Sequence, residues 1–215
     1  QTTAVSRFTA GIRFITSRPI ILGAISLDLF AVLLGGVVAL LPIYAAEILH
    51  VGPAGLGLLR SAIALGELGM GFYLSIRPLN ARMGQRMFLA VAVFGVANLV
   101  FALSTWFWVS CAALFIAGAA DMISVYIRSS LIQFATPDDM RGRVSAVNML
   151  FIGSSNELGE FRAGVSATAL GTVPAALFGA VSTLVIVAMW TRLFRPLWTI
   201  ENNEQALPQR QKDPA

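Results

Sequence analysis

Six long apolar stretches, separated by short polar gaps, constrain this chain more than any other feature of its sequence. A helix that crosses the hydrocarbon core of a bilayer needs about 20 predominantly apolar residues. The stretches come close to that length or exceed it, and they cover approximately residues 20–45, 56–76, 87–103, 107–134, 144–170 and 173–194. We therefore predict an all-α membrane protein with six transmembrane helices.

The composition agrees with lipid as the solvent. Hydrophobic residues make up 57% of the chain and charged residues only 12%, with a mean hydropathy of +0.77, whereas soluble domains carry about 25% charged residues. The net charge of +4 does not indicate nucleic acid as a partner, because the basic residues are scattered among the gaps. With one cysteine (Cys111) and one histidine (His50), we expect no intrachain disulfide, no metal site and no cofactor.

The arginines are distributed by side. They lie in every second gap and in both terminal segments, whereas the gaps at residues 47–53, 104–106 and 171–172 contain neither Lys nor Arg. Cytoplasmic loops of membrane proteins carry the excess of basic residues. We therefore predict that both termini are cytoplasmic. Residues 1–18 are then a linker or interfacial segment, residues 19–195 the six-helix bundle, and residues 196–215 a polar tail.

Two local signals refine this outline. Thr136, Pro137 and the two acids that follow predict the start of a short cytoplasmic helix that leads into the fifth span, with Thr136 as its N-cap. The pair Gly35–Gly36 lies below Pro42 in the first span. It either allows close helix packing or acts as a hinge.

Charged side chains inside the apolar stretches are the main functional signal, and they are Asp28, Arg60, Glu67, Asp121, Arg128, Glu157, Glu160 and Arg162. A charge near the bilayer centre costs about 2.5 to 3.5 kcal/mol on insertion scales, so such residues face a polar interior or a partner. They occupy the first, second, fourth and fifth predicted helices, and the third and sixth have none. We infer that the third and sixth helices face lipid and the others line a polar path, as two inverted triplets would.

The spacing of these charges leaves their role open. Arg60 and Glu67 are seven residues apart, as are Asp121 and Arg128, so each pair shares a helix face but is too far apart for a direct bond. Each residue is placed to meet a partner on a neighbouring helix. The pairs are either static and fix helix packing, or they include carboxylates that take up protons and ion pairs that break as a gate.

Our working assignment follows from these positions. Asp28, Asp121 and Glu157 line the path as contacts for protons or substrate, and Arg128 balances a carboxylate. Arg60 and Glu67 stabilise packing or gating. Glu160 and Arg162 lie towards the outer end of their span, so we expect both side chains to snorkel to the interface.

Several segments resemble a known family, and they are residues 17–19, 27–34, 136–138, 141–145 and, most specifically, 148–160. They are similar to the C-terminal half of major facilitator superfamily exporters, in particular the enterobactin-exporter-like bacterial efflux proteins. Residues 78–86 resemble the second copy of the family's cytoplasmic Gly-Arg loop, with Gly84 between the basic positions Arg82 and Arg86. Ala81 stands where that loop motif has an acid. Arg141 and Arg143 belong to the next cytoplasmic segment that carries the resemblance.

The resemblance implies a twelve-helix protein of which this chain is one half, with an N-terminal six-helix half as its partner. It implies a multi-pass protein of the bacterial inner membrane that exports siderophore-like or drug-like molecules by proton antiport and alternating access. An enzyme is not expected, because the chain has no G-x-S-x-G and no phosphate-binding G-x-x-x-x-G-K-[ST] motif. A membrane scaffold or partner subunit without transport activity is the alternative.

Overall fold

The computed structural model describes residues 4–79 and 81–200. The secondary structure of these residues is entirely helical, as predicted. The elements are α1 (Ala4–Thr16), α2 (Pro19–Gly35), η1 (Val38–Leu40), α3 (Leu41–Ile43), η2 (Tyr44–Ile48), α4 (Gly52–Ile76), α5 (Met83–Leu103), α6 (Phe107–Ala135), α7 (Asp138–Leu170), α8 (Thr172–Leu193) and α9 (Arg195–Trp198).

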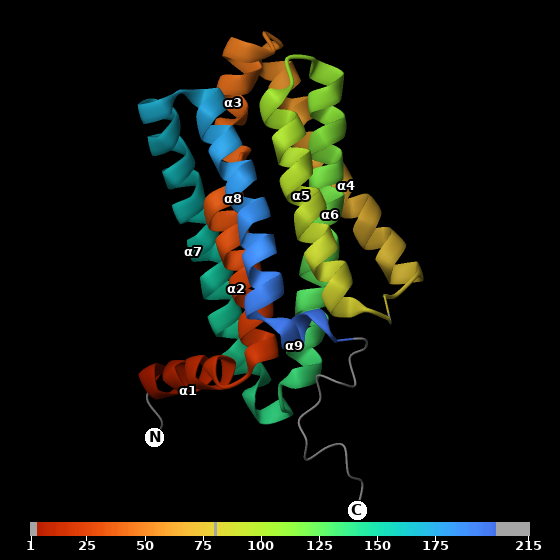
Figure 1. Ribbon diagram of the computed structural model, residues 1–215, viewed down its shortest axis with the longest axis vertical. Coiled ribbons are helices and arrows are strands. Elements are labelled where there is room, and N and C mark those ends of the chain that lie inside the picture. The colour runs from red at the N-terminus through yellow and green to blue at the C-terminus, as the bar shows by residue number, and fades with distance from the viewer. Residues whose placement is uncertain (1–3, 80, 201–215) are drawn as a thin grey trace, which may run out of the picture.

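The long helices run up and down along one axis, and α1 lies across the lower end of the bundle (Figure 1). Neighbours in space follow the order α4, α6, α5, α8, α2 and α7, with each helix packed against the next. Helices α5 and α8 are therefore central to the packing, whereas α4 and α7 are the two outermost members of this series. Helix α2 meets α6 directly as well, and the site described below depends on that contact.

Four segments are long and apolar enough to cross a membrane, and they are Pro19–Ile48, Met83–Leu103, Phe107–Ala135 and Thr172–Leu193. Helices α4 and α7 have 25 and 33 residues, which is sufficient length. Their many glycines, small polar residues and charges reduce their apolar character. The prediction of several helices that are long and apolar enough to span a membrane is confirmed for these four, and the full number of six stays a prediction.

The first span is discontinuous. Helix α2 ends at Gly35, and Gly36 adopts an extended backbone with φ of −60° and ψ of 124°. The chain then continues through a 3-10 turn, a short α-helical turn and a π-helical turn up to Ile48. A Cβ atom at Gly35 would collide with Thr183 Oγ1 of α8, so this glycine packs closely at the point where the helix breaks. The pair thus combines close packing with a change of backbone direction.

Helix α7 begins differently from the prediction. Its N-cap is Pro137, without a side-chain cap, and it continues unbroken from Asp138 to Leu170 rather than starting as a separate short helix. Thr136 Oγ1 is buried without a hydrogen-bond partner among the described residues, so Thr136 is not the capping residue. The extended conformation that proline favours in the preceding residue keeps Thr136 outside the helix.

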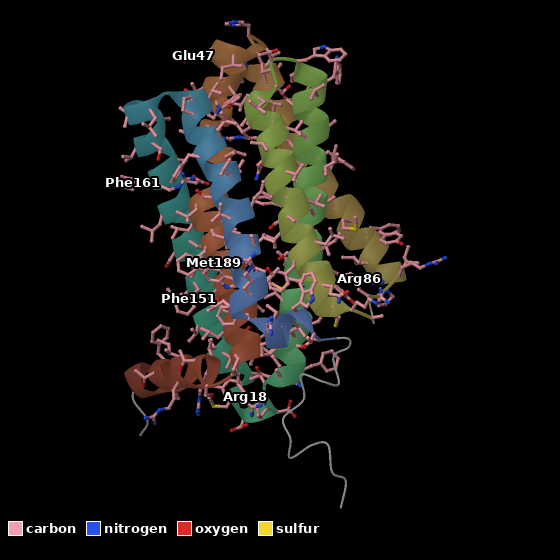
Figure 2. All side chains as sticks on the ribbon, in the orientation of Figure 1. Arg18, Glu47, Arg86, Phe151, Phe161 and Met189 are labelled. Atoms are coloured by element: carbon pink, nitrogen blue, oxygen red, sulfur yellow. The ribbon has the colours of Figure 1, made fainter. Side chains whose placement is uncertain are left out.

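The arginines outside the spans gather at one end of the bundle, because the helices alternate in direction. Figure 2 shows Arg18 and Arg86 at the lower end and Glu47 at the upper end. The C-terminal segment belongs to the lower end too, where Leu197 and Ile200 are buried in the hydrophobic core. The packed structure therefore extends beyond residue 195, and residues 201–215 of the predicted tail lie outside the described residues.

Candidate functional site

Two groups of charged residues lie inside the bundle. The first is an ion pair between Asp28 on α2 and Arg128 on α6. Both side chains are almost completely buried, with exposed fractions of 8% for Asp28 and 4% for Arg128. The pair links the two helices where they meet, and each charge compensates the other in a site closed to solvent. Arg128 Nε has no hydrogen-bond partner among the described residues, so the guanidinium is satisfied only in part.

The second group surrounds a cavity of about 260 Å³ next to the break in the first span. Five long segments contribute to its wall. The lining residues are Val32, Gly36, Val37, Val38, Ile63, Glu67, Phe94, Asn98, Leu114, Ala117, Gly118, Asp121, Asn156 and Glu160. Three carboxylates and two amides thus share one cavity with apolar side chains, and the lining residues include no Lys, Arg or His.

The carboxylates come from three different helices. Glu67 lies on α4, Asp121 on α6 and Glu160 on α7. Asp121 and Glu67 lie where α4 packs against α6, and both border this cavity. The only ion pairs among the described residues are Arg128–Asp28 and the exposed pair Arg141–Asp138, so none of the three is neutralised by a basic side chain there.

Asn98 completes the polar wall. Its side chain is 1% exposed, and its Nδ2 has no hydrogen-bond partner among the described residues. It belongs to α5, the third predicted span. The prediction that this helix contributes nothing to the polar path is wrong, because a helix can present lipid-facing residues on one side and a single amide on the other. The outer face of α5 does carry exposed apolar residues, namely Leu89, Val93, Val96, Val100 and Leu103.

Close packing of α4 on α6 sets the distance between Glu67 and Asp121. A Cβ atom at Gly66 would collide with the carbonyl oxygen of Phe115, and one at Gly118 would collide with that of Ile63. Glycine therefore allows the two backbones to touch within one turn of each carboxylate. The sequence places the acids on these helices, and the glycines bring them to the same cavity.

Three predicted residues on α7 lie as follows. Glu157 is exposed and does not line the cavity, whereas its neighbours Asn156 and Glu160 do. Glu160 is exposed as Glu157 is, but it borders the cavity. Arg162 does not snorkel, since its Nε donates a hydrogen bond to the carbonyl oxygen of Leu33 at 3.0 Å. Its guanidinium also lies 5.8 Å from the centroid of the Phe178 ring.

Arg60 lies on an exposed face of α4 and forms no ion pair among the described residues. It is seven residues from Glu67, which corresponds to about 10 Å along the helix axis. The structure does not bring Arg60 and Glu67 together. Glu67 belongs to the cavity with Asp121, and Arg60 does not line that cavity.

The loop motif has a structural role in this chain. Gly84 is buried, and its backbone N–H donates to the carbonyl oxygen of Ile200 at 3.2 Å. A Cβ atom at Gly84 would collide with the carbonyl oxygen of Leu197, so only glycine fits beneath the C-terminal segment. Arg82 and Arg86 are exposed on either side, and Arg82 has a left-handed backbone with φ of 52°.

The other motif arginines lie on α7. Arg141 NH1 forms an exposed ion pair with Asp138 Oδ1 at 2.8 Å. Arg143 NH1 lies 3.4 Å from the sulfur of Met140. Both residues are in the first turns of α7, at the same end of the bundle as Arg18 and Arg86. They contribute to the basic end and not to the cavity.

The comparisons with known proteins agree with this architecture. Residues 1–214 match the transmembrane secretion effector family, which is of the major facilitator type. The chain belongs to this family. The transmembrane secretion effector match covers the helical bundle and both groups of internal charges, so this chain is a multi-pass membrane protein of a transporter family. No curated protein and no solved structure matched the chain.

Proposed function

We propose that this chain is one half of a secondary transporter that exports small molecules by proton antiport with alternating access. Family membership supports transport, and the cavity supports a polar route through the bundle. The observation that carries the proposal is the set of uncompensated carboxylates, Glu67, Asp121 and Glu160, around one internal cavity. Carboxylates in such a place can gain and lose protons as access changes.

The proposal includes the arrangement in the membrane. All six long segments cross the bilayer as two inverted triplets, and the basic end of the bundle faces the cytoplasm of a bacterial cell. The break at Gly36 supports this view, because irregular backbone inside a membrane is tolerated where it lines a polar cavity. An N-terminal six-helix half completes the transport path, and the substrate is siderophore-like or drug-like.

The test compares carboxylates in the two internal groups. Inside-out vesicles with an acidic interior receive candidate siderophores and drug-like compounds in the external medium, and the release of protons from the vesicle interior as substrate enters is recorded. Wild-type vesicles exchange substrate for protons, and a protonophore abolishes the exchange. Asp121→Asn removes the exchange while the amount of protein in the membrane stays unchanged.

Normal proton exchange by both Asp28→Asn and Asp121→Asn variants would show that these carboxylates do not couple transport. Absence of any substrate-dependent proton movement in wild-type vesicles, with the protein correctly inserted, would favour a scaffold or a partner subunit instead.

A further inference from the structure

The residues that line the cavity between α4, α5, α6 and α7 indicate the charge of its ligand. Its wall contains Glu67, Asp121 and Glu160, and the residues that line it include no basic side chain. Arg128 is paired with Asp28, and Arg162, which does not line the cavity, donates to the carbonyl oxygen of Leu33 while its NH1 has no hydrogen-bond partner among the described residues. Among the residues that line the cavity, an anionic ligand would meet only like charge, whereas a cation would meet carboxylates from three helices.

A metal ion does not fit this arrangement. Among the described residues, no three acidic, histidine or cysteine side chains are grouped closely enough to hold a metal ion. The carboxylates come from three helices around a space of about 260 Å³, whose wall also includes Phe94 and Leu114. A space of that size, partly apolar, accommodates a small organic molecule.

Asn98 supplies a second and independent indication of a ligand. Asn98 is one of the residues that line the cavity, and its buried Nδ2 has no hydrogen-bond partner among the described residues. A buried amide donor without a partner is unfavourable by about 1 to 3 kcal/mol unless something accepts its hydrogen bond. The ligand therefore carries an acceptor in addition to its positive charge.

We infer that this cavity binds a small organic cation, an amine with a hydrogen-bond acceptor at its far end, held between the carboxylates and the amide of Asn98. This inference rests on the proposed function, and it names the class of substrate. The ammonium group donates to Glu67 and Asp121, Glu160 adds a further negative charge to the wall, the acceptor receives the Asn98 amide, and the apolar body contacts Phe94 and its neighbours. Because no basic residue lines the cavity, it binds cations in preference to anions of similar size.

The test measures equilibrium binding to the protein in lipid nanodiscs, with no gradient and no transport step. The probes are three molecules of matched size, namely radiolabelled tyramine, its neutral alcohol analogue tyrosol, and the anion para-hydroxyphenylpropanoate. We expect tyramine to bind about tenfold or more tightly than tyrosol, as a charge-assisted hydrogen bond predicts, and the anion to bind least. Equal binding of tyramine and tyrosol, or no saturable tyramine binding, would overturn the inference.

Variants then locate the bound probe. Glu67→Gln and Asp121→Asn lose the preference for tyramine over tyrosol, and Glu47→Gln, a change of the same kind at the upper end of the bundle and outside the cavity lining, keeps it. Because a change on α4 or α6 can affect folding, Glu160→Gln on the exposed side of the cavity serves as a second variant, and each protein is checked by its thermal unfolding. A preference retained in all three cavity variants contradicts the assignment.

Asn98→Leu tests the other end of the ligand. Tyramine carries a phenol oxygen that phenethylamine lacks, so wild-type protein favours tyramine over phenethylamine by about fivefold, the value of one hydrogen bond. The variant binds the two equally while it keeps its preference for an amine over an alcohol. Cation binding without proton exchange in vesicles would refute the proposed transport but leave this inference standing, and exchange of neutral molecules alone would do the reverse.

Discussion

Helix α6 carries one acidic and one basic residue, and the two have opposite surroundings. Arg128 is buried and paired with Asp28 on α2. Asp121, two turns earlier on the same helix, faces a cavity that it shares with Glu67 and Glu160 and that has no basic residue in its wall. One group is closed and compensated, and the other is open and uncompensated. A charged residue in an apolar helix can therefore be either a member of a buried ion pair or an unpaired residue that lines a cavity.

The difference lies in what each helix meets. Between α2 and α6 the side chains meet directly, so the opposite charges satisfy each other and hold the two helices together. Between α4, α6 and α7 the break in the first span leaves room, and the charges line that room. We expect the first group to act on stability and the second to act on binding. The predictions below separate these two roles.

The largest effect is expected from breaking the buried pair on one side. Arg128→Met leaves Asp28 as an uncompensated buried carboxylate, and removal of one partner of such a pair is unfavourable by about 3 to 5 kcal/mol. The variant should lose most of its folded population in detergent, measured by equilibrium unfolding in mixed micelles.

The double variant Asp28→Leu/Arg128→Met is the matched control, because it removes both charges and leaves no unpaired group. It should recover most of the stability that the single change loses. If the single and double variants are equally unstable, the pair does not hold α2 to α6 by its charges, and the contrast with the cavity fails.

A smaller effect is expected at the contact that positions the cavity acids. A side chain at Gly118 would push the backbone of Ile63 away, so Gly118→Val should destabilise the protein by about 1 to 3 kcal/mol. It should also weaken tyramine binding, because the displacement of α4 would move Glu67 away from Asp121. The matched control is Gly153→Val on α7, where no atom lies within 4 Å of the added Cβ. Unchanged tyramine binding in Gly118→Val would separate helix packing from the cavity.

The sequence predicted the helical class and the positions of most helices because both depend on long apolar segments. Helices α5, α6 and α8 begin and end within a few residues of the predicted stretches. It also predicted which helices carry internal charges. These features are local, since hydropathy and charge can be counted along the chain.

The orientation of each helix about its axis was not predictable in the same way. Helix α7 has polar residues on more than one face, so nothing in its sequence decides between Glu157 and Glu160 as the cavity residue. Asn98 is the strongest polar group of the third predicted span, but one amide in an apolar helix does not indicate which way the side chain faces. Only the packing of α5 places Asn98 among the residues that line the cavity.

The third prediction concerns Asp121, where we expect the opposite of the effect at the buried pair, namely little change in stability but a loss of binding preference. Asp121→Asn removes a charge that has no basic partner among the described residues and that shares a cavity with a second carboxylate, Glu67. We expect the free energy of unfolding to change by less than about 1 kcal/mol, in the stabilising direction, while the preference for tyramine disappears. Unfolding in mixed micelles and binding in nanodiscs are measured on the same preparation. A loss of stability as large as that of Arg128→Met would mean that Asp121 is a structural partner of another group.

The smallest effect is expected at the basic end, where charge pairing is fully exposed. Arg141 and Asp138 are 2.8 Å apart on the first turns of α7, with side chains that are 57% and 87% exposed. Water and salt screen such a pair, so Arg141→Gln should change the free energy of unfolding by less than about 0.5 kcal/mol, and added salt should remove that difference. Tyramine binding should be unchanged, because this end does not contribute to the cavity. A salt-independent loss of stability would show that Arg141 acts through a contact other than this ion pair, and exposure would then no longer distinguish the charges that matter from those that do not.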